Sequence, residues 1–190
     1  MIAYDAHGGM YAARLWWMLR WIGHTQVAVL DGGVAAWQAA GGELVTSLTT
    51  LEPGNIVQGP SLVRSVDVQH VLNNLDSNMD QILDARAPDR FRGENESIDP
   101  VAGHIPGAKS RFFKDNLDAN GQFKPAEQLR AEFSALLPDV NHAIMQCGSG
   151  VTACHNLLAL EIAGMPGAAL YPGSWSEWCA DSSRPVAVGA

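Results

Sequence analysis

The sequence predicts an α/β fold built around a mostly parallel sheet. Strand-like apolar segments alternate with helix-like segments along the chain, and such alternation produces right-handed crossovers between parallel strands. Hydrophobic residues make up 47% of the chain and charged residues 17%, a balance that suits a packed core and argues against disorder. The length of 190 residues fits one ordinary domain with an additional segment.

The first 42 residues contain two pairs of a strand and a helix. In chain order, we expect a strand at 2–5, a helix at 9–23, a strand and turn at 27–33, and a helix at 34–42. Asp31 belongs to the turn, which lacks the run of oxygen ligands of a calcium loop. Residues 43–60 carry Pro and Gly without a clear period and are therefore predicted to be a linker.

Residues 61–190 continue the alternation. We expect a strand at 81–86, a turn at 103–108 and a helix at 124–137. A strand at 142–146 then leads through the 147–152 loop into a helix that ends at Ile162, and a strand, turn and helix follow at 168–178. Ser65 is the expected cap of a helix that ends near Leu75. Pro125 suits a first helical turn, and Gly164 suits a helix end.

The chain contains an internal repeat. A shift of 141 positions places the first segment on the last without a gap, so that Gly9 falls on Gly150 and Trp37 on Trp178. The shared glycines occupy loops, helix ends and turns, where backbone freedom is needed. In this comparison Ala6 falls on Cys147, so only the second copy carries the thiol.

The stretch "QCGSGVTACHN" (146–156) places Cys147 between a buried strand and a helix. Backbone N–H groups of Gly148, Ser149 and Gly150 can turn inward and form an anion-binding nest at the positive end of the helix dipole. Such a site favours a thiolate. The stretch therefore predicts a nucleophilic Cys147 that carries an anionic intermediate in the nest.

Three other interpretations of this loop are weighed against the nucleophile. A zinc site would need further ligands at closer spacing than Cys154 and His155, so no metal site is predicted. A cysteine phosphatase would place an arginine where this chain has Ala153. The remaining alternative is that Cys147 is only a small buried residue.

Composition restricts the partners and the compartment. A net charge of -8 makes nucleic acid or an anionic membrane an unfavourable partner. Three cysteines in a chain of this length do not suggest a disulfide framework, and the start of the chain has no basic, apolar leader, so we expect a protein of the reducing cytoplasm.

The motifs "CGSGVTACHN", "GHIPGA" and "GSWSEW" resemble those of the tandem-domain rhodanese superfamily. Within it, "CGSGVT" is similar to the loop of the 3-mercaptopyruvate sulfurtransferases, and "LDARAPDRFRG" (83–93) to the family's substrate-arginine segment. The resemblance implies that residues 61–190 form a catalytic rhodanese-like domain. It also implies that residues 1–42 match only the last part of an inactive, truncated N-terminal domain of the same kind.

The resemblance implies a sulfurtransferase mechanism. Cys147 would take sulfur from 3-mercaptopyruvate or thiosulfate and become a persulfide, with no cofactor besides this covalent intermediate. A thiol, cyanide or a thioredoxin-like protein would accept the sulfur. Ser149 would assist proton movement, and the N–H groups of the loop residues would hold the persulfide; these residues are Gly148, Ser149, Gly150, Val151 and Thr152.

Two arginines are candidates for binding the donor. By motif position Arg90 would pair with the substrate carboxylate, a charge-assisted contact. Arg86 is the weaker candidate, because an internal salt bridge with Asp84 is the better interpretation. Many 3-mercaptopyruvate enzymes have a further arginine in this region, but residues 93–102 contain none, which indicates weaker carboxylate binding or a different preferred donor.

A half domain would expose strand edges and apolar side chains such as Trp16, Trp17 and Trp21. We therefore expect self-association through residues 1–42, or disorder there. The rival to an enzyme is a non-catalytic rhodanese-like module that carries persulfide sulfur or binds a partner.

Several other residues have modest expected roles. His104 is expected to fix a turn. Cys154 could resolve a persulfide, but core packing is the better interpretation. Cys179 could be exposed, and its role is open. Trp175 and Trp178 are expected to pack beside the loop.

Overall fold

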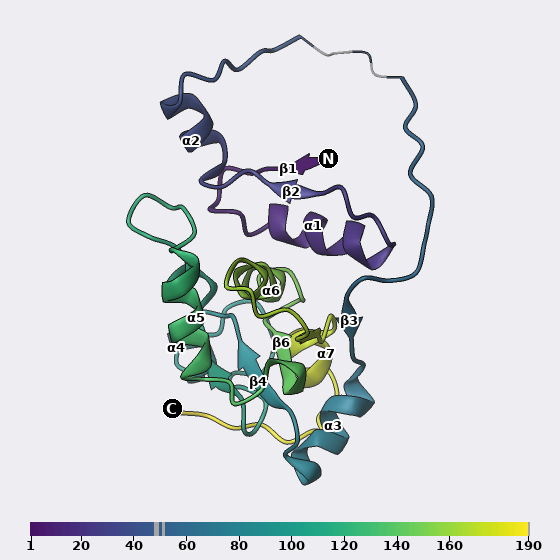
Figure 1. Ribbon diagram of the computed structural model, residues 1–190. Helices are drawn as coiled ribbons and strands as arrows, with labels where there is room; N and C mark the ends of the chain where they lie inside the picture. Colours follow the sequence, from purple (N-terminus) through teal and green to yellow (C-terminus); the bar gives the residue numbers. More distant parts are fainter. Residues whose placement is uncertain (48–49, 51, 190) are drawn as a thin grey trace.

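The computed structural model describes residues 1–47, 50 and 52–189, and its larger part is a five-stranded sheet (Figure 1). The strands lie in the order β3-β7-β6-β4-β5. Their bounds are β3 (Arg64–Ser65), β4 (Gln81–Asp84), β5 (Lys109–Ser110), β6 (Ala143–Gln146) and β7 (Ala169–Leu170). All paired strands run parallel, so the predicted α/β fold with a parallel sheet flanked by helices is confirmed.

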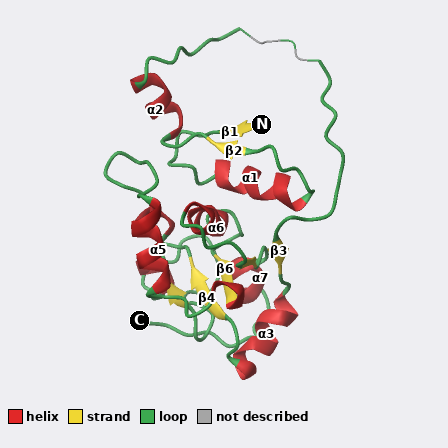
Figure 2. Ribbon diagram, in the orientation of Figure 1, coloured by secondary structure: helices red, strands yellow, loops and turns green. Residues whose placement is uncertain are grey.

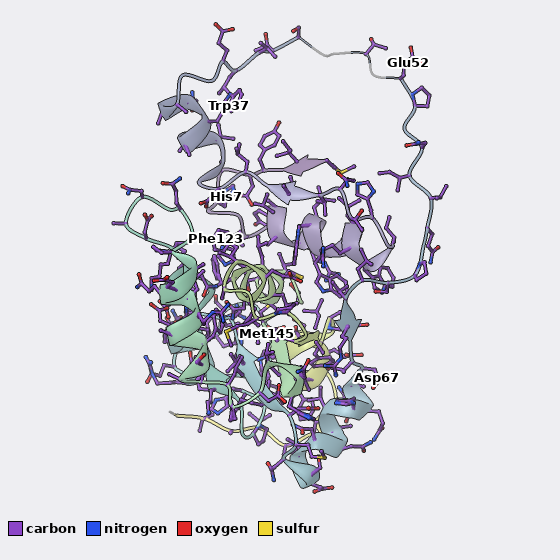
Figure 3. All side chains as sticks on the ribbon, viewed as in Figure 1. His7, Trp37, Glu52, Asp67, Phe123 and Met145 are labelled. Carbon is purple, nitrogen blue, oxygen red and sulfur yellow. The ribbon has the colours of Figure 1, made fainter. Side chains whose placement is uncertain are left out.

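Helices cover both faces of this sheet (Figure 2). They are α3 (Val68–Ser77), α4 (Pro88–Phe91), α5 (Ala126–Ser134), α6 (Ala153–Ile162) and α7 (Ser174–Cys179), with 3-10 helices η1 (Phe113–Asn116) and η2 (Val140–His142). Successive side chains of β6 point to opposite faces. Ile144 belongs to the same buried cluster as Trp175 of α7, whereas Met145, labelled in Figure 3, belongs to the cluster that contains Leu158 of α6. A strand buried on both faces is continuously apolar, which explains why the sequence predicts β6 well.

The first 40 residues form a smaller unit that lies against α6. It consists of β1 (Ile2–Ala3), α1 (Ala12–Trp21), β2 (Ala28–Val29) and α2 (Gly33–Ala39), with β1 and β2 paired in parallel. Figure 1 shows α1 lying across α6, and Arg20 of α1 pairs with Glu161 of α6 at 3.4 Å. Asp31, in the turn after β2, accepts a hydrogen bond from the Phe123 N–H at 2.9 Å.

The expected exposure of the three tryptophans of α1 is wrong for two of them. Trp16 and Trp17 are only 5% and 4% exposed, because α1 turns them toward α6 and the main core. Trp21 is 50% exposed, as expected, and stacks on Trp17. Self-association through residues 1–42 stays a prediction.

The third helix begins at a different residue from the expected one. Ser65 lies in β3, and Asp67 is the cap of α3, because its Oδ1 accepts the His70 N–H at 2.9 Å (Asp67 is labelled in Figure 3). The sequence also gives no indication of β3, β5 or α4. These elements have two to four residues, too few to carry a hydrophobic period.

The described residues between α2 and β3 form an extended connection without regular structure (Figure 1). Residues 43–47, 50 and 52–60 contain no helix or strand, while positions 48, 49 and 51 of the predicted linker lie outside the described residues. The domain boundaries inferred from the sequence stay predictions. Among the helices of the described residues, none has both the length and the apolar character needed to cross a bilayer.

Candidate active site

Cys147 follows β6 directly and faces a pocket of about 360 Å³. The residue is 2% exposed, so Cys147 is almost fully enclosed at the base of this pocket. The pocket is also lined by all the predicted loop residues except Gly150, by both arginines Arg86 and Arg90, and by Met10 and Tyr11 from the smaller unit. The predicted site residues therefore gather in one place, and the smaller unit supplies part of its wall.

The backbone of the loop is held from one side. The Ser174 hydroxyl accepts the Cys147 N–H at 3.1 Å, and the N–H groups of Trp175 and Ser176 donate to the carbonyls of Cys147 and Gly148 at 3.0 and 2.9 Å. Among the described residues, none accepts a hydrogen bond from the N–H groups of residues 148–153. These groups surround the start of α6, where N–H groups are left without partners in the helix.

The corresponding loop of the smaller unit shows what such N–H groups bind. The carboxylate of Asp5, at the end of β1, accepts hydrogen bonds from four backbone N–H groups at 2.8–2.9 Å, those of His7, Gly9, Tyr11 and Ala12. Burial alone would raise the pKa of Asp5, but these four bonds outweigh it and hold the pKa below its usual value. A loop of this design therefore stabilises a negative charge.

Asp5, rather than Ala6, is the counterpart of Cys147. The Val34 N–H donates to the Asp5 carbonyl at 3.1 Å, just as the Trp175 N–H donates to the Cys147 carbonyl at 3.0 Å. The ungapped comparison of the two sequences was wrong at this point, because the first loop is one residue longer than the second before Gly9 and Gly150.

Gly150 is essential to the shape of the second loop. Its φ is +73°, and a Cβ there would lie 2.5 Å from the Pro172 carbonyl oxygen. Gly9, its counterpart, has φ of +86°. Arg14 of α1 donates to the Gly150 carbonyl at 3.4 Å, so the smaller unit also contacts the loop directly.

Arg86 is an internal ion-pair residue, as predicted. It is 3% exposed, and its Nη2 lies 2.7 Å from both Asp84 Oδ2 and the Gly103 carbonyl oxygen. Its guanidinium lies over the Trp175 ring at 4.8 Å. These contacts leave Arg86 as part of the pocket wall.

Arg90 approaches the loop but is already paired on one side. Its Nε and Nη2 donate to the carboxylate of Glu96, the shortest contact being 2.8 Å, and Nη2 lies 3.2 Å from Asp99 Oδ2. Burial would raise the pKa of Glu96, but the hydrogen bonds from Arg90 and two backbone N–H groups lower it. Arg90 Nη1 lies 3.8 Å from a Cβ built on Gly148, and among the described residues none accepts a bond from it.

Two pocket residues have no signal in the sequence. Asp99 lies in an irregular segment, and Ser176 is one of several small polar residues near the chain end. The structure joins them by a hydrogen bond of 2.6 Å between Ser176 Oγ and Asp99 Oδ1. Only the packing of α7 beside the loop brings them together.

The remaining cysteines lie away from solvent. Cys154 is 0% exposed and packs in the core as predicted, and burial raises the pKa of its thiol to about 12. Cys179 could have been exposed, but it is only 7% exposed, because α7 turns it toward the cluster of Trp175 and Trp178. Both tryptophans are fully buried, as predicted.

Two histidines have structural partners. His104 Nδ1 lies 2.8 Å from the Phe91 carbonyl oxygen, which fits the predicted turn-fixing role. His155 is 0% exposed, and its Nε2 lies 3.0 Å from the Gly8 carbonyl oxygen. Across the described ranges, no three His, Cys, Asp or Glu side chains gather in a way that could hold a metal ion.

Comparisons with known proteins identify the family to which this chain is similar. The model of the family described as rhodanese-like domain matches residues 1–40 and 67–181. The chain is 50% identical, over its whole length and 68% of the relative, to a probable 3-mercaptopyruvate sulfurtransferase of Pseudomonas aeruginosa. It is 38% identical, over its whole length and 67% of the relative, to a putative thiosulfate sulfurtransferase of Mycobacterium tuberculosis.

A solved structure shows the same fold. The crystal structure of SseA from Escherichia coli, from work on 3-mercaptopyruvate sulfotransferases, has a TM-score of 0.77 and 36% identity to this chain. The match covers 92% of this chain and 66% of SseA. This chain thus spans about two thirds of the length of these relatives.

Proposed function

This chain belongs to the family of rhodanese-like domains, and we propose that it transfers sulfane sulfur through a persulfide on Cys147. The names of its relatives confirm the predicted class of enzyme, a sulfurtransferase of the 3-mercaptopyruvate or thiosulfate type. The donor, the persulfide and the acceptor are parts of the proposal.

The observation that carries the proposal is the equivalence of Asp5 and Cys147. In the first loop a carboxylate at this position takes four N–H bonds. In the second loop the N–H groups of residues 148–153 have no acceptor among the described residues. An anionic persulfide on Cys147 would place its terminal sulfur where these groups can stabilise it, as oxyanion holes stabilise charge in other enzymes.

The first half-reaction consumes the donor. The Cys147 thiolate attacks the sulfur of 3-mercaptopyruvate, a sulfur–sulfur bond forms, and the bond between that sulfur and C3 breaks. The electron pair passes to C3 as the enolate of pyruvate, which then takes a proton. Ser149 is exposed on the pocket wall and is the proposed group that assists proton movement at the sulfur. With thiosulfate the leaving group is sulfite.

The second half-reaction regenerates the Cys147 thiolate of the free enzyme. A thiol or cyanide attacks the outer sulfur, the sulfur–sulfur bond breaks, and the Cys147 thiolate leaves. The products are a new persulfide or thiocyanate. A thioredoxin-like protein is the proposed macromolecular acceptor, and no metal or organic cofactor takes part in either half-reaction.

Arg90 is the proposed contact for the donor carboxylate. Its Nη1 lies near Gly148, beside the nucleophile, and has no acceptor among the described residues. Because Glu96 and Asp99 hold the other side of the guanidinium, Arg90 would offer one N–H group rather than a bidentate fork. This geometry supports modest rather than tight carboxylate binding.

The test is the intact mass of the protein after incubation with 3-mercaptopyruvate or thiosulfate. We expect a gain of one sulfur atom, reversed by cyanide and absent in Cys147→Ser, together with pyruvate release from 3-mercaptopyruvate. Cys154→Ser is the matched control and should still gain the sulfur. Persulfide formation without turnover would favour a sulfur-carrying module, and no mass gain with either donor would refute the proposal.

A further inference from the structure

Asp99 is fixed against the catalytic loop by contacts on both of its oxygens. Oδ1 accepts the Ser176 hydroxyl at 2.6 Å, and Oδ2 lies 3.2 Å from Arg90 Nη2. The Ser176 N–H in turn donates to the Gly148 carbonyl at 2.9 Å. The Asp99 side chain is 7% exposed and lines the same pocket as Cys147. Its charge is therefore held next to the space that a donor would occupy.

The two arginines of the pocket do not leave a surplus of positive charge. Arg86 is paired with Asp84 at 2.7 Å and with Glu96 at 3.4 Å. Arg90 is paired with Glu96 and also with Asp99. Two guanidinium groups thus face three carboxylates, and Asp99 is the carboxylate that reaches the pocket wall. The charged group left to receive an incoming anion is Arg90 Nη1, which lies beside the N–H groups of the loop.

We propose that Asp99 is a specificity-determining residue whose carboxylate selects sulfur donors with one negative charge over donors with two. A thiol monocarboxylate such as 3-mercaptopyruvate satisfies Arg90 Nη1 with its single charge. A dianion such as thiosulfate would bring a second charge close to Asp99 in a partly desolvated space, where repulsion is strong. The donor choice rests on the proposed function, whereas the charge selectivity of the pocket does not.

Alkylation of Cys147 tests the selectivity without sulfur transfer. 2-Bromopropanoate and bromosuccinate alkylate thiols by the same reaction and carry one and two negative charges. We expect Asp99→Asn, which keeps an acceptor for Ser176, to raise the ratio of the bromosuccinate to the 2-bromopropanoate rate constant about tenfold. Peptide mapping assigns the label to Cys147. Glu94→Gln is the control, because Glu94 pairs with Arg92, is 58% exposed and should leave the ratio unchanged.

Steady-state kinetics test the consequence for donors. Asp99→Asn should raise kcat/KM for thiosulfate relative to 3-mercaptopyruvate by a similar factor. Asp99→Ser removes the same charge with a smaller side chain, so it must shift both ratios in the same direction. If neither donor turns over in the native chain, the proposed function fails while the alkylation ratio still decides the role of Asp99. Ratios within twofold of the native protein in both variants would overturn the inference.

Discussion

Asp5 and Cys147 occupy equivalent positions in two strand–loop–helix units of the same chain. Each residue follows a parallel strand and precedes a helix, and each carbonyl accepts a backbone N–H from the start of a second helix, α2 or α7. In the first unit the anion is the side chain of Asp5, so the loop is filled by its own chain. In the second unit the loop holds a thiol instead, and the proposed persulfide would supply the anion.

Removing the charge of Asp5 should loosen the smaller unit. Asp5→Asn leaves an amide in place of the carboxylate that binds four N–H groups, and we expect the free energy of unfolding to fall by about 1–2 kcal/mol. Urea unfolding followed by tryptophan fluorescence measures the loss, and hydrogen exchange should quicken at residues 9–13. Glu43→Gln, an exposed change in the segment that follows the smaller unit, is the control and should behave as the native protein. Unchanged exchange in Asp5→Asn would contradict this assignment.

Replacing Gly150 should disable the loop while the fold survives. Gly150→Ala places a Cβ 2.5 Å from the Pro172 carbonyl oxygen at a φ of +73°, so the loop must distort. We expect turnover and Cys147 alkylation to fall by roughly tenfold or more. Gly148→Ala is the matched control, since its nearest neighbour would be Arg90 Nη1 at 3.8 Å, an ordinary contact. Equal rates in the two variants would show that this backbone shape is unimportant.

Acid should weaken the junction between the two units through His155. Burial lowers the pKa of His155 to about 4, although the Gly8 carbonyl opposes this shift. The unfolded chain therefore binds a proton that the folded chain does not, and stability falls as the pH drops from about 6.5 to 4, by about 1–3 kcal/mol. His155→Phe, which cannot be protonated, should flatten the dependence of unfolding free energy on pH over this range. His7→Gln, an exposed change, should keep the native dependence of unfolding free energy on pH. If His155→Phe also kept that dependence, His155 would not be its source.

Glu132 should also make stability depend on pH, over a more acidic range than His155 does. Burial would raise the pKa of Glu132, but bonds from Lys124, Arg111 and Gln128 outweigh it and lower the pKa to about 2. Its stabilisation is therefore complete above pH of about 4.5 and lost as the pH falls toward 2. At pH 7 we expect Glu132→Gln to cost on the order of 1–2 kcal/mol in urea unfolding, with the difference nearly gone at pH 2. Glu127→Gln on the same helix should cost little at either pH, and a pH-independent loss in Glu132→Gln would argue against the ion pairs.

The sequence by itself determined the α/β class, the parallel sheet and the loop that carries Cys147. These features are local, because they depend on the apolar run of β6, on glycines at positive φ and on the thiol before a helix. The salt bridge of Arg86 with Asp84 was also predictable, since a single residue separates the pair at one strand end. Short elements such as β3 and α4 carried no such pattern.

Only the tertiary structure decided which charges and surfaces meet. The equivalence of Asp5 and Cys147 depends on a one-residue difference in loop length that hydrogen bonds from Val34 and Trp175 reveal. The burial of Trp16 and the proximity of Asp99 to the nucleophile depend on how α1 and α7 pack against distant segments. Such contacts join residues far apart in the chain, so neither the residue types nor their spacing in the sequence predicts them. The loop chemistry is therefore local, whereas the charge environment that would choose its donor is set by packing.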